Sequence, residues 1–249
     1  TYTILDKCHN PNELKNEWDR RGLVYGHVQS GKTANYIGLI NRAYDSGYKI
    51  VIVLTGMTED LRIQTQDRID EGVIGKRDGK SVGIGEEVEF QKIEEIKAAT
   101  LYHKDLRTSD NWRDSHINVK KKSIWVIKKN KTVLENLIRW LDKQRIAGGQ
   151  SKIHNVPFLI IDDEADNASI QSLTKKDYNE WGEGQALDKI DFEDLNPSQL
   201  EILKKAQNRV IKAINRNIRV ILSLMSHKTF VAYTATPYSV INQIKEDFE

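Results

Sequence analysis

The chain has 249 residues, of which 39% are hydrophobic and 30% charged, and its formal net charge is +2. This composition is typical of a globular protein with a substantial core, and a near-neutral charge neither requires nor excludes a nucleic-acid partner, because binding needs only a local basic surface. The single cysteine, Cys8, excludes an internal disulfide and argues against a cysteine-based zinc site, and no apolar run approaches the roughly 18 residues of a membrane span.

Short apolar runs alternate with helical patterns along the whole chain, which predicts an α/β fold with a mainly parallel sheet and helices on both faces. Strands are predicted at residues 22–25, 49–55, 123–127, 158–161 and 229–234. Helices are predicted to begin near Thr33, at Thr58, before Leu134 and at Pro197. We expect Gly47 to end the first helix and Gly148 the third. Insertions are expected at about 71–122, beginning with the polar stretch 71–87, and at about 167–196.

The strongest signal is a complete phosphate-binding loop between a predicted strand and a predicted helix, Gly26-His27-Val28-Gln29-Ser30-Gly31-Lys32-Thr33. Its glycines allow the backbone to curl so that N–H groups point at phosphates, and the following helix adds its N-terminal dipole. The spacing predicts phosphate binding by Gly26, Gln29, Ser30 and Gly31. Lys32 should neutralise the β- and γ-phosphates of ATP, and the Thr33 hydroxyl should ligate Mg²⁺. The alternative is a glycine turn with a surface lysine, which the flanking strand and helix disfavour.

A second motif, Asp162-Asp163-Glu164-Ala165-Asp166, follows the apolar run 158–161. P-loop enzymes hold magnesium with an acidic residue at such a strand end, so we expect Asp163 to bind the metal and Glu164 to polarise the attacking water. Asp162 also follows the apolar run and leaves the register open. Asp163 is preferred because D-E-A-D then begins there. A solvated acidic turn is the alternative interpretation of this segment taken alone.

The third motif is Tyr233-Thr234-Ala235-Thr236-Pro237, again at a predicted strand end. The hydroxyls of Thr234 and Thr236, together with Asp166, could couple the acidic motif to the state of the γ-phosphate. Alone, this segment also fits a simple strand-to-turn transition. Its significance comes from the order of the three motifs along the chain, all at the carboxyl ends of predicted strands, where open α/β sheets bind their ligands.

In that order the motifs resemble the first RecA-like domain of a superfamily-two helicase or translocase. The third motif differs from the S-A-T of DEAD-box RNA helicases and is similar to that of restriction-enzyme motors. A closer resemblance is to the Z-one domain family, helicase-like proteins described as putative endonucleases and found with bacterial restriction and defence systems. It rests on residues 26–36, 52–56, 61–66, 163–169 and 233–237.

The resemblance implies a single RecA-like motor domain over residues 1–249, a cytoplasmic ATP-hydrolysing enzyme that acts on DNA with Mg²⁺ as cofactor. Residues 1–10 have no signal-peptide core, and the chain begins with Thr, so we expect a fragment of a longer protein. Partners would be DNA, a second RecA-like domain in the same full-length chain and defence-system proteins. In helicases the second domain supplies an arginine worth roughly 10³- to 10⁵-fold in rate, so this chain alone should hydrolyse ATP slowly.

Nucleic-acid contacts are the least specific part of the prediction. The segment 55–66 corresponds to the motif that touches the nucleic-acid backbone in such motors, and contacts of this kind are made to phosphates. Its candidates are Thr55, Arg62, Gln64 and Thr65. Arg62 also fits a solvated helix position. A lysine-rich segment could line a DNA track or be ordinary solvated surface, and comprises Lys120, Lys121, Lys122, Lys128, Lys129 and Lys131.

Two other functions remain open at the level of sequence. The first is an endonuclease component acting on DNA, although the acidic motif is already accounted for by nucleotide chemistry. The second is a nucleotide-controlled assembly switch without motor activity, which would differ from a motor in ignoring DNA.

Overall fold

The fold is that of a computed structural model, which describes residues 1–27, 30–86, 96–101, 105–106, 121–165 and 197–236, with only the backbone for 197–208. Its centre is a six-stranded sheet with the order β1-β8-β7-β2-β6-β5, in which every pair of neighbours is parallel. The strands are β1 (Trp18–Tyr25), β2 (Ile50–Thr55), β5 (Lys97–Ala98), β6 (Ser123–Lys128), β7 (Ile153–Asp162) and β8 (Met225–Thr234).

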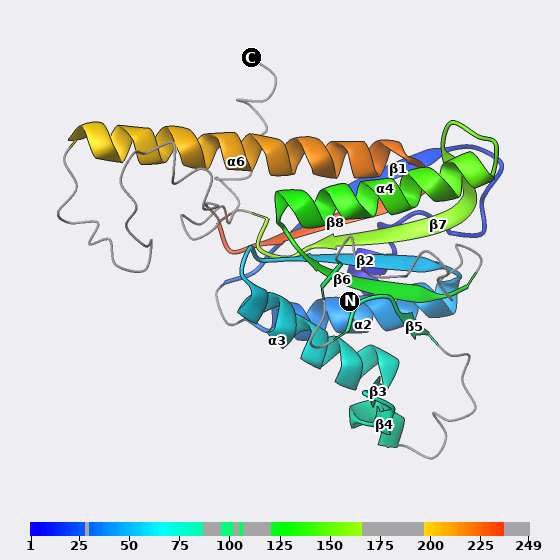
Figure 1. The fold of residues 1–249 in the computed structure, drawn as a ribbon. Coiled ribbons are helices and arrows are strands. Elements are labelled where there is room, and N and C mark those ends of the chain that lie inside the picture. The colour runs from blue at the N-terminus through cyan, green and yellow to red at the C-terminus, as the bar shows by residue number, and fades with distance from the viewer. Residues whose placement is uncertain (28–29, 87–95, 102–104, 107–120, 166–196, 237–249) are drawn as a thin grey trace.

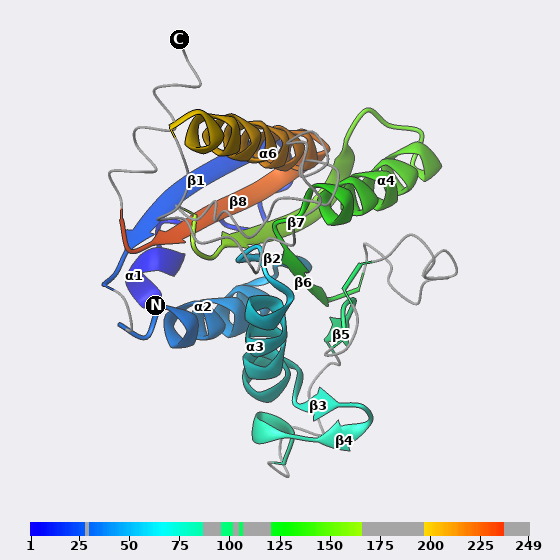
Figure 2. The same ribbon diagram turned by 60° about the vertical axis from the view of Figure 1, so that its left-hand side comes forward.

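Helices cover both faces of this sheet (Figure 1). The long helices α4 (Lys131–Ala147) and α6 (Pro197–Ser223) lie on one face, and α2 (Lys32–Ser46) and α3 (Glu59–Ile69) lie on the other. The short helix α1 (Tyr2–Leu5) packs beside α2 (Figure 2). The predicted fold class is therefore confirmed: the protein is α/β with a parallel sheet between two helical layers, as in a RecA-like domain.

Alternate residues of the central strand supply two separate cores. Ile50, Ile52 and Leu54 pack into the cluster beneath α4 and α6, whereas Val51 and Val53 pack into the cluster beneath α2. All six residues of β2 are buried. Since both faces are covered, residues 50–54 are apolar without alternation, which is why the sequence pattern identifies the strand.

The strand order places β8 between β1, which precedes the phosphate loop, and β7, which precedes the acidic motif. The chain crosses from β1 to β2 by way of α2 and returns to β7 and β8 only later. The order of strands in the sheet therefore differs from their order in the chain. In open α/β sheets ligands bind at the carboxyl ends of the strands, in the crevice at the point where the strand order reverses. The three sequence motifs all lie at this edge.

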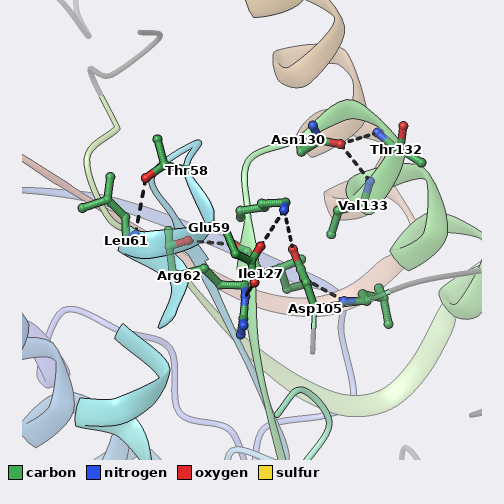
Figure 3. A network of polar contacts seen from close by, with 12 residues as sticks. Thr58, Glu59, Leu61, Arg62, Asp105, Ile127, Asn130, Thr132 and Val133 are labelled. Carbon is green, nitrogen blue, oxygen red and sulfur yellow. Dashed lines mark hydrogen bonds and ion pairs between the residues drawn. The ribbon is translucent and has the colours of Figure 1, made fainter. Parts of the chain in front are cut away.

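The helix ends follow their sequence signals. Gly47 ends α2 in the left-handed conformation with φ 117°, and its N–H bonds the Ala43 and Tyr44 carbonyls. Thr58 caps α3, because its side chain accepts from the Leu61 N–H. Asn130 caps α4 in the same way and accepts from two N–H groups (Figure 3).

The expected insertion after residue 70 has a compact described part. It follows α3 directly as a π-helical turn, η1 (Asp70–Ile74), then a hairpin of β3 (Lys76–Arg77) and β4 (Lys80–Ser81), and a 3₁₀ turn, η2 (Gly83–Glu86). The expected insertion 167–196 lies outside the described residues, as does most of 87–120. Within the described part of the chain, no helix has the length and apolar character needed to cross a bilayer.

Candidate nucleotide-binding site

The phosphate loop begins where β1 ends and is tied to the neighbouring strand. The Gly26 N–H donates to the Thr234 carbonyl over 3.1 Å, and the Ser30 N–H donates to the His27 carbonyl over 3.1 Å. Gly31 has a φ of 78°, a left-handed conformation that glycine adopts without strain. A side chain at Gly26 would come within 2.8 Å of the Ser30 hydroxyl. Gln29, the remaining predicted phosphate ligand, lies outside the described residues.

Lys32 lies across this loop. Its Nζ donates to the Gly26 and His27 carbonyls, each over 3.1 Å. Both partners are neutral backbone oxygens, so the ammonium retains its full charge for an anion entering the loop. A phosphate would compete with two ordinary hydrogen bonds by offering stronger, charge-assisted ones.

The acidic turn is fixed to the strands on either side of it. The Asp163 N–H donates to the Leu54 carbonyl on β2, and the Ala165 N–H donates to the Tyr233 carbonyl on β8. Between them Glu164 adopts a φ of 56°, a left-handed conformation that non-glycine residues adopt uncommonly and at a cost in energy. The two backbone bonds hold Glu164 in this geometry at the carboxyl edge of the sheet.

The ambiguity between Asp162 and Asp163 is resolved by burial. The Asp162 carboxylate faces the interior, where the buried Lys129 ammonium binds it at 2.8 Å. Lys129 also donates to the carbonyls of Asp163 and Glu164, at 2.8 and 2.7 Å. Asp163 is half-buried instead and lines the cleft described below. Asp162 is therefore structural, and Asp163 is the acidic residue available to a ligand.

The position of Lys129 shows that part of the predicted lysine track is wrong. It is 4% exposed and supports the acidic turn from beneath. Its neighbour Lys128 pairs with Glu59 at 2.5 Å and lies 3.8 Å from Asp105. Neither lysine has the free surface that a DNA track requires. Lys121 and Lys131 are exposed, and Lys120 lies outside the described residues.

Tyr36 connects the phosphate-loop helix to the acidic turn. Its ring is fully buried, and its hydroxyl donates to the Asp163 Oδ2 over 3.1 Å. The Thr33 and Thr65 hydroxyls also interact with this phenol, although burial dominates and raises its pKa. Thr33 and Asp163, the two predicted metal ligands, therefore converge on one side chain.

Burial raises the pKa of the Asp163 carboxyl above its ordinary value, while the Tyr36 hydrogen bond acts to lower it. A cation beside Asp163 would favour the charged form. A hydroxyl and a carboxylate are oxygen ligands suited to Mg²⁺, which takes one or two protein ligands plus substrate phosphates. Among the described residues no group of three or more acidic, histidine or cysteine side chains is arranged to hold a metal ion by itself, and a magnesium that is also bound by substrate phosphates needs no such group.

These residues open onto a single cleft of about 1010 Å³. The phosphate loop and the start of α2 form one wall, and the acidic turn and the end of β8 form another. The lining residues that sequence analysis predicted are Ser30, Gly31, Lys32, Thr33, Asp163, Glu164 and Thr236. The volume is at the upper end of the range for small-molecule sites, and its polar groups come from three separate segments of the chain.

The two threonines of the third motif have different positions. Thr234 is fully buried, and its hydroxyl accepts from the Thr236 N–H over 3.0 Å. Thr236 is exposed and lines the cleft. Thr234 therefore shapes the turn that presents Thr236 beside the acidic motif. Asp166, the third predicted coupling residue, lies outside the described residues.

A third wall of the cleft was missed by the sequence reasoning. It consists of the end of α3 and the described part of the insertion, and contributes Arg68, Glu71, Gly72, Gly83 and Ile84. The Arg68 Nη1 donates to the Thr33 Oγ1 over 3.1 Å. No motif marks these residues, because they meet the phosphate loop only through the fold.

The predicted nucleic-acid contacts are corrected for three of four residues. Thr55 is 1% exposed, Arg62 0% and Thr65 8%. Arg62 donates to Glu59, which lies beside it in Figure 3, over 2.7 Å. It also donates to the Leu101 carbonyl over 3.1 Å. These side chains are committed to the interior, which leaves them no surface for a phosphate backbone. Gln64 is exposed and keeps its candidacy.

In comparisons with known proteins, no family model and no curated protein matches this chain.

Proposed function

We propose that this chain binds ATP with Mg²⁺ and hydrolyses it. The observation that supports this most strongly is that Lys32, Thr33, Asp163 and Glu164 line one cleft. More than a hundred residues separate the first two from the last two in the sequence. A strand-end loop with inward N–H groups, a lysine and a strand-end acidic pair is the set of groups that phosphoryl transfer requires. A surface glycine turn would not require the acidic pair.

Each residue has a defined task in this reaction. Lys32 leaves the Gly26 and His27 carbonyls to bind the terminal phosphates, and the loop N–H groups bind the rest of the chain of phosphates. Thr33 and Asp163 would hold the metal ion, which would supply positive charge to neutralise the charge developing on the phosphoryl oxygens. Glu164 lies beside Asp163 with its carboxylate next to the backbone of Gly56, and it orients and polarises the attacking water.

We further propose that ATP hydrolysis serves a helicase-like DNA translocase, in which this chain is the first motor domain. The order of motifs and the resemblance to the Z-one domain family support this proposal, together with the RecA-like strand order. The partners would be DNA, a second RecA-like domain and proteins of a restriction or defence system. The buried polar residues of α3 cannot contact DNA. Gln64 and exposed lysines such as Lys121 would therefore make the contacts with DNA.

Nucleotide binding and hydrolysis are tested separately with two substitutions. Lys32→Ala should weaken MgATP binding roughly 10- to 100-fold, the value of a charge-assisted contact, measured by calorimetric titration. Glu164→Gln should leave MgATP binding within a few-fold and lower turnover about 10²- to 10⁴-fold, as expected when a general base is lost. Lys143→Ala is the matched control, because it removes an exposed charge from α4 on the opposite face of the sheet.

The type of ATPase is tested with DNA. A motor should hydrolyse ATP faster when duplex or single-stranded DNA is added, whereas an assembly switch should not respond. DNA cleavage that persists in Glu164→Gln would indicate a nuclease activity separate from the nucleotide site. The proposal of an ATPase is wrong if the unaltered chain binds MgATP no more tightly than the Lys32→Ala chain does.

A further inference from the structure

Arg68 stands out among the residues of the cleft that the proposed mechanism does not use. It lies in the last turn of α3, its side chain is exposed, and it reaches across to the first turn of α2. There its Nη1 donates to the Thr33 hydroxyl over 3.1 Å. The guanidinium is thus placed against the residue that should hold the metal ion, although it comes from a separate element.

The position is electrostatically unfavourable for a cation unless an anion is also present. The N-terminus of α2 carries the positive end of the helix dipole, and Lys32 adds a full positive charge in the same turn. Among the described residues Arg68 forms no ion pair, in contrast to Arg77 nearby, which pairs with Glu71 at 3.4 Å. An arginine needed only to anchor α3 would gain more from a carboxylate than from a neutral hydroxyl.

The bond to Thr33 also places a positive charge where metal binding would be opposed by it. A threonine hydroxyl has two lone pairs, and in this structure one of them accepts from Arg68 at the oxygen that should face the metal. When that oxygen ligates a cation, the positively charged guanidinium must move away from it. With a nucleotide bound, the terminal phosphate group beside Thr33 and Asp163 would offer the guanidinium an anion of higher charge than any of the carboxylates that line the cleft, Glu71, Asp163 and Glu164.

We propose that Arg68 is a catalytic arginine supplied by this chain itself, which binds the γ-phosphate of the nucleotide and stabilises charge in the transition state. The inference rests on the proposed ATPase function and deepens it. A guanidinium can bind a phosphate with two parallel hydrogen bonds. The site would therefore contain one arginine before a second motor domain contributes another.

The proposal is tested by comparing affinities for MgATP and MgADP in the 249-residue chain. Arg68→Ala should weaken MgATP binding roughly 10-fold or more and leave MgADP binding within about twofold, because ADP lacks the contacted phosphate. Single-turnover hydrolysis should fall by roughly 10³-fold, the lower bound for such arginines. Arg68→Lys keeps the charge without the fork and should recover only part of both losses. Lys143→Ala, on the opposite face, should change none of these quantities.

The outcomes distinguish this inference from the function on which it rests. Equal weakening of MgATP and MgADP, or a lower melting temperature with unchanged ATP preference, would show that Arg68 only anchors α3 and would overturn the proposal. Full turnover in Arg68→Ala would overturn it as well. If the unaltered chain binds neither nucleotide, both the ATPase function and the role of Arg68 are refuted together. Preferential loss of MgATP binding in Arg68→Ala alone supports the assignment.

Discussion

Tyr36 offers the sharpest test of the metal site, because its hydroxyl can be removed without disturbing the packing of its ring. The ring is fully buried and packs edge-on against Tyr233 at 5.6 Å between centroids. Tyr36→Phe preserves that contact, deletes the donor to Asp163 Oδ2 and removes the phenol oxygen with which Thr33 and Thr65 also interact. Asp163 Oδ1 keeps its bond from the Glu164 N–H at 3.1 Å, so the carboxylate stays in place but loses one of two orienting partners.

The size of the effect follows from the chemistry of the lost bond. Loss of a partner that orients a metal ligand typically costs 10- to 100-fold in metal affinity. The Tyr36 bond also acts to lower the pKa of the Asp163 carboxyl, which burial raises. Without it that pKa rises further, and because metal binding requires the ionised carboxylate, the loss should grow as the pH falls. We expect the Mg²⁺ concentration for half-maximal ATP binding to increase roughly 10-fold or more at neutral pH.

The assay is a Mg²⁺ titration of ATP binding at several pH values. Tyr233→Phe is the matched control, because it removes the hydroxyl of the other ring in the same pair, whose partner is Asn35 rather than an acidic residue. Tyr233→Phe should lose about 1 kcal/mol of folding stability for one neutral hydrogen bond, and Tyr36→Phe about 1.5–3 kcal/mol because its partner is a carboxylate. Equal Mg²⁺ requirements in the two variants would refute the claim that Tyr36 orients a metal ligand.

Lys129→Met should lower the free energy of unfolding by about 3–5 kcal/mol, since Asp162 would be left buried and unpaired; a loss below about 1 kcal/mol in urea unfolding would contradict its structural role. Burial raises the pKa of the Asp105 carboxyl from 3.8 to about 6. Below pH 3.8 the carboxyl is protonated in both the folded and the unfolded chain and does not affect the free energy of unfolding. As the pH rises from 3.8 through about 6, this free energy decreases, because the buried carboxyl must ionise in the folded chain. Asp105→Asn should therefore stabilise the chain by up to about 3 kcal/mol well above that pH and have no effect below 3.8, and a pH-independent effect in denaturation curves would exclude this cause. Gly56→Ala would place a Cβ against the Leu61 side chain and 2.8 Å from the Glu164 carboxylate. If Leu61 changes rotamer and Glu164 is displaced, steady-state assays should show reduced turnover with a smaller change in MgATP affinity.

The central strands could be predicted from the sequence because they are buried on both faces of the sheet. Residues 50–54 are all apolar, and so are 158–161, which favours a buried strand for each segment. Strand β1 was predicted only from Gly22, whereas it begins at Trp18. It lies at the edge of the described sheet, and its first half is mostly exposed and polar, so no apolar run marks it.

The candidate site divides in the same way. That Lys32, Thr33 and Asp163 meet at one cleft could be predicted, because phosphate and magnesium chemistry would require these residue types at strand ends. Lys129 and Arg68 could not, because each acts through a contact between elements distant in sequence. A lysine beside a strand looks the same in the sequence whether its ammonium faces water or, as here, a buried carboxylate.

Helix α3 shows how one sequence segment changes meaning once its burial is known. Its polar residues suggested a surface for nucleic acid, yet their hydrogen bonds run inward: Gln66 accepts from Thr100 over 2.8 Å and donates to Asp70 over 2.8 Å. Thr65 meets the Tyr36 phenol, which also donates to the proposed metal ligand Asp163, and Arg68 extends from the same helix into the cleft. The buried polar bonds fix α3 to its neighbours in the fold. Of the four residues that the sequence suggested for contact with nucleic acid, Gln64 alone is exposed.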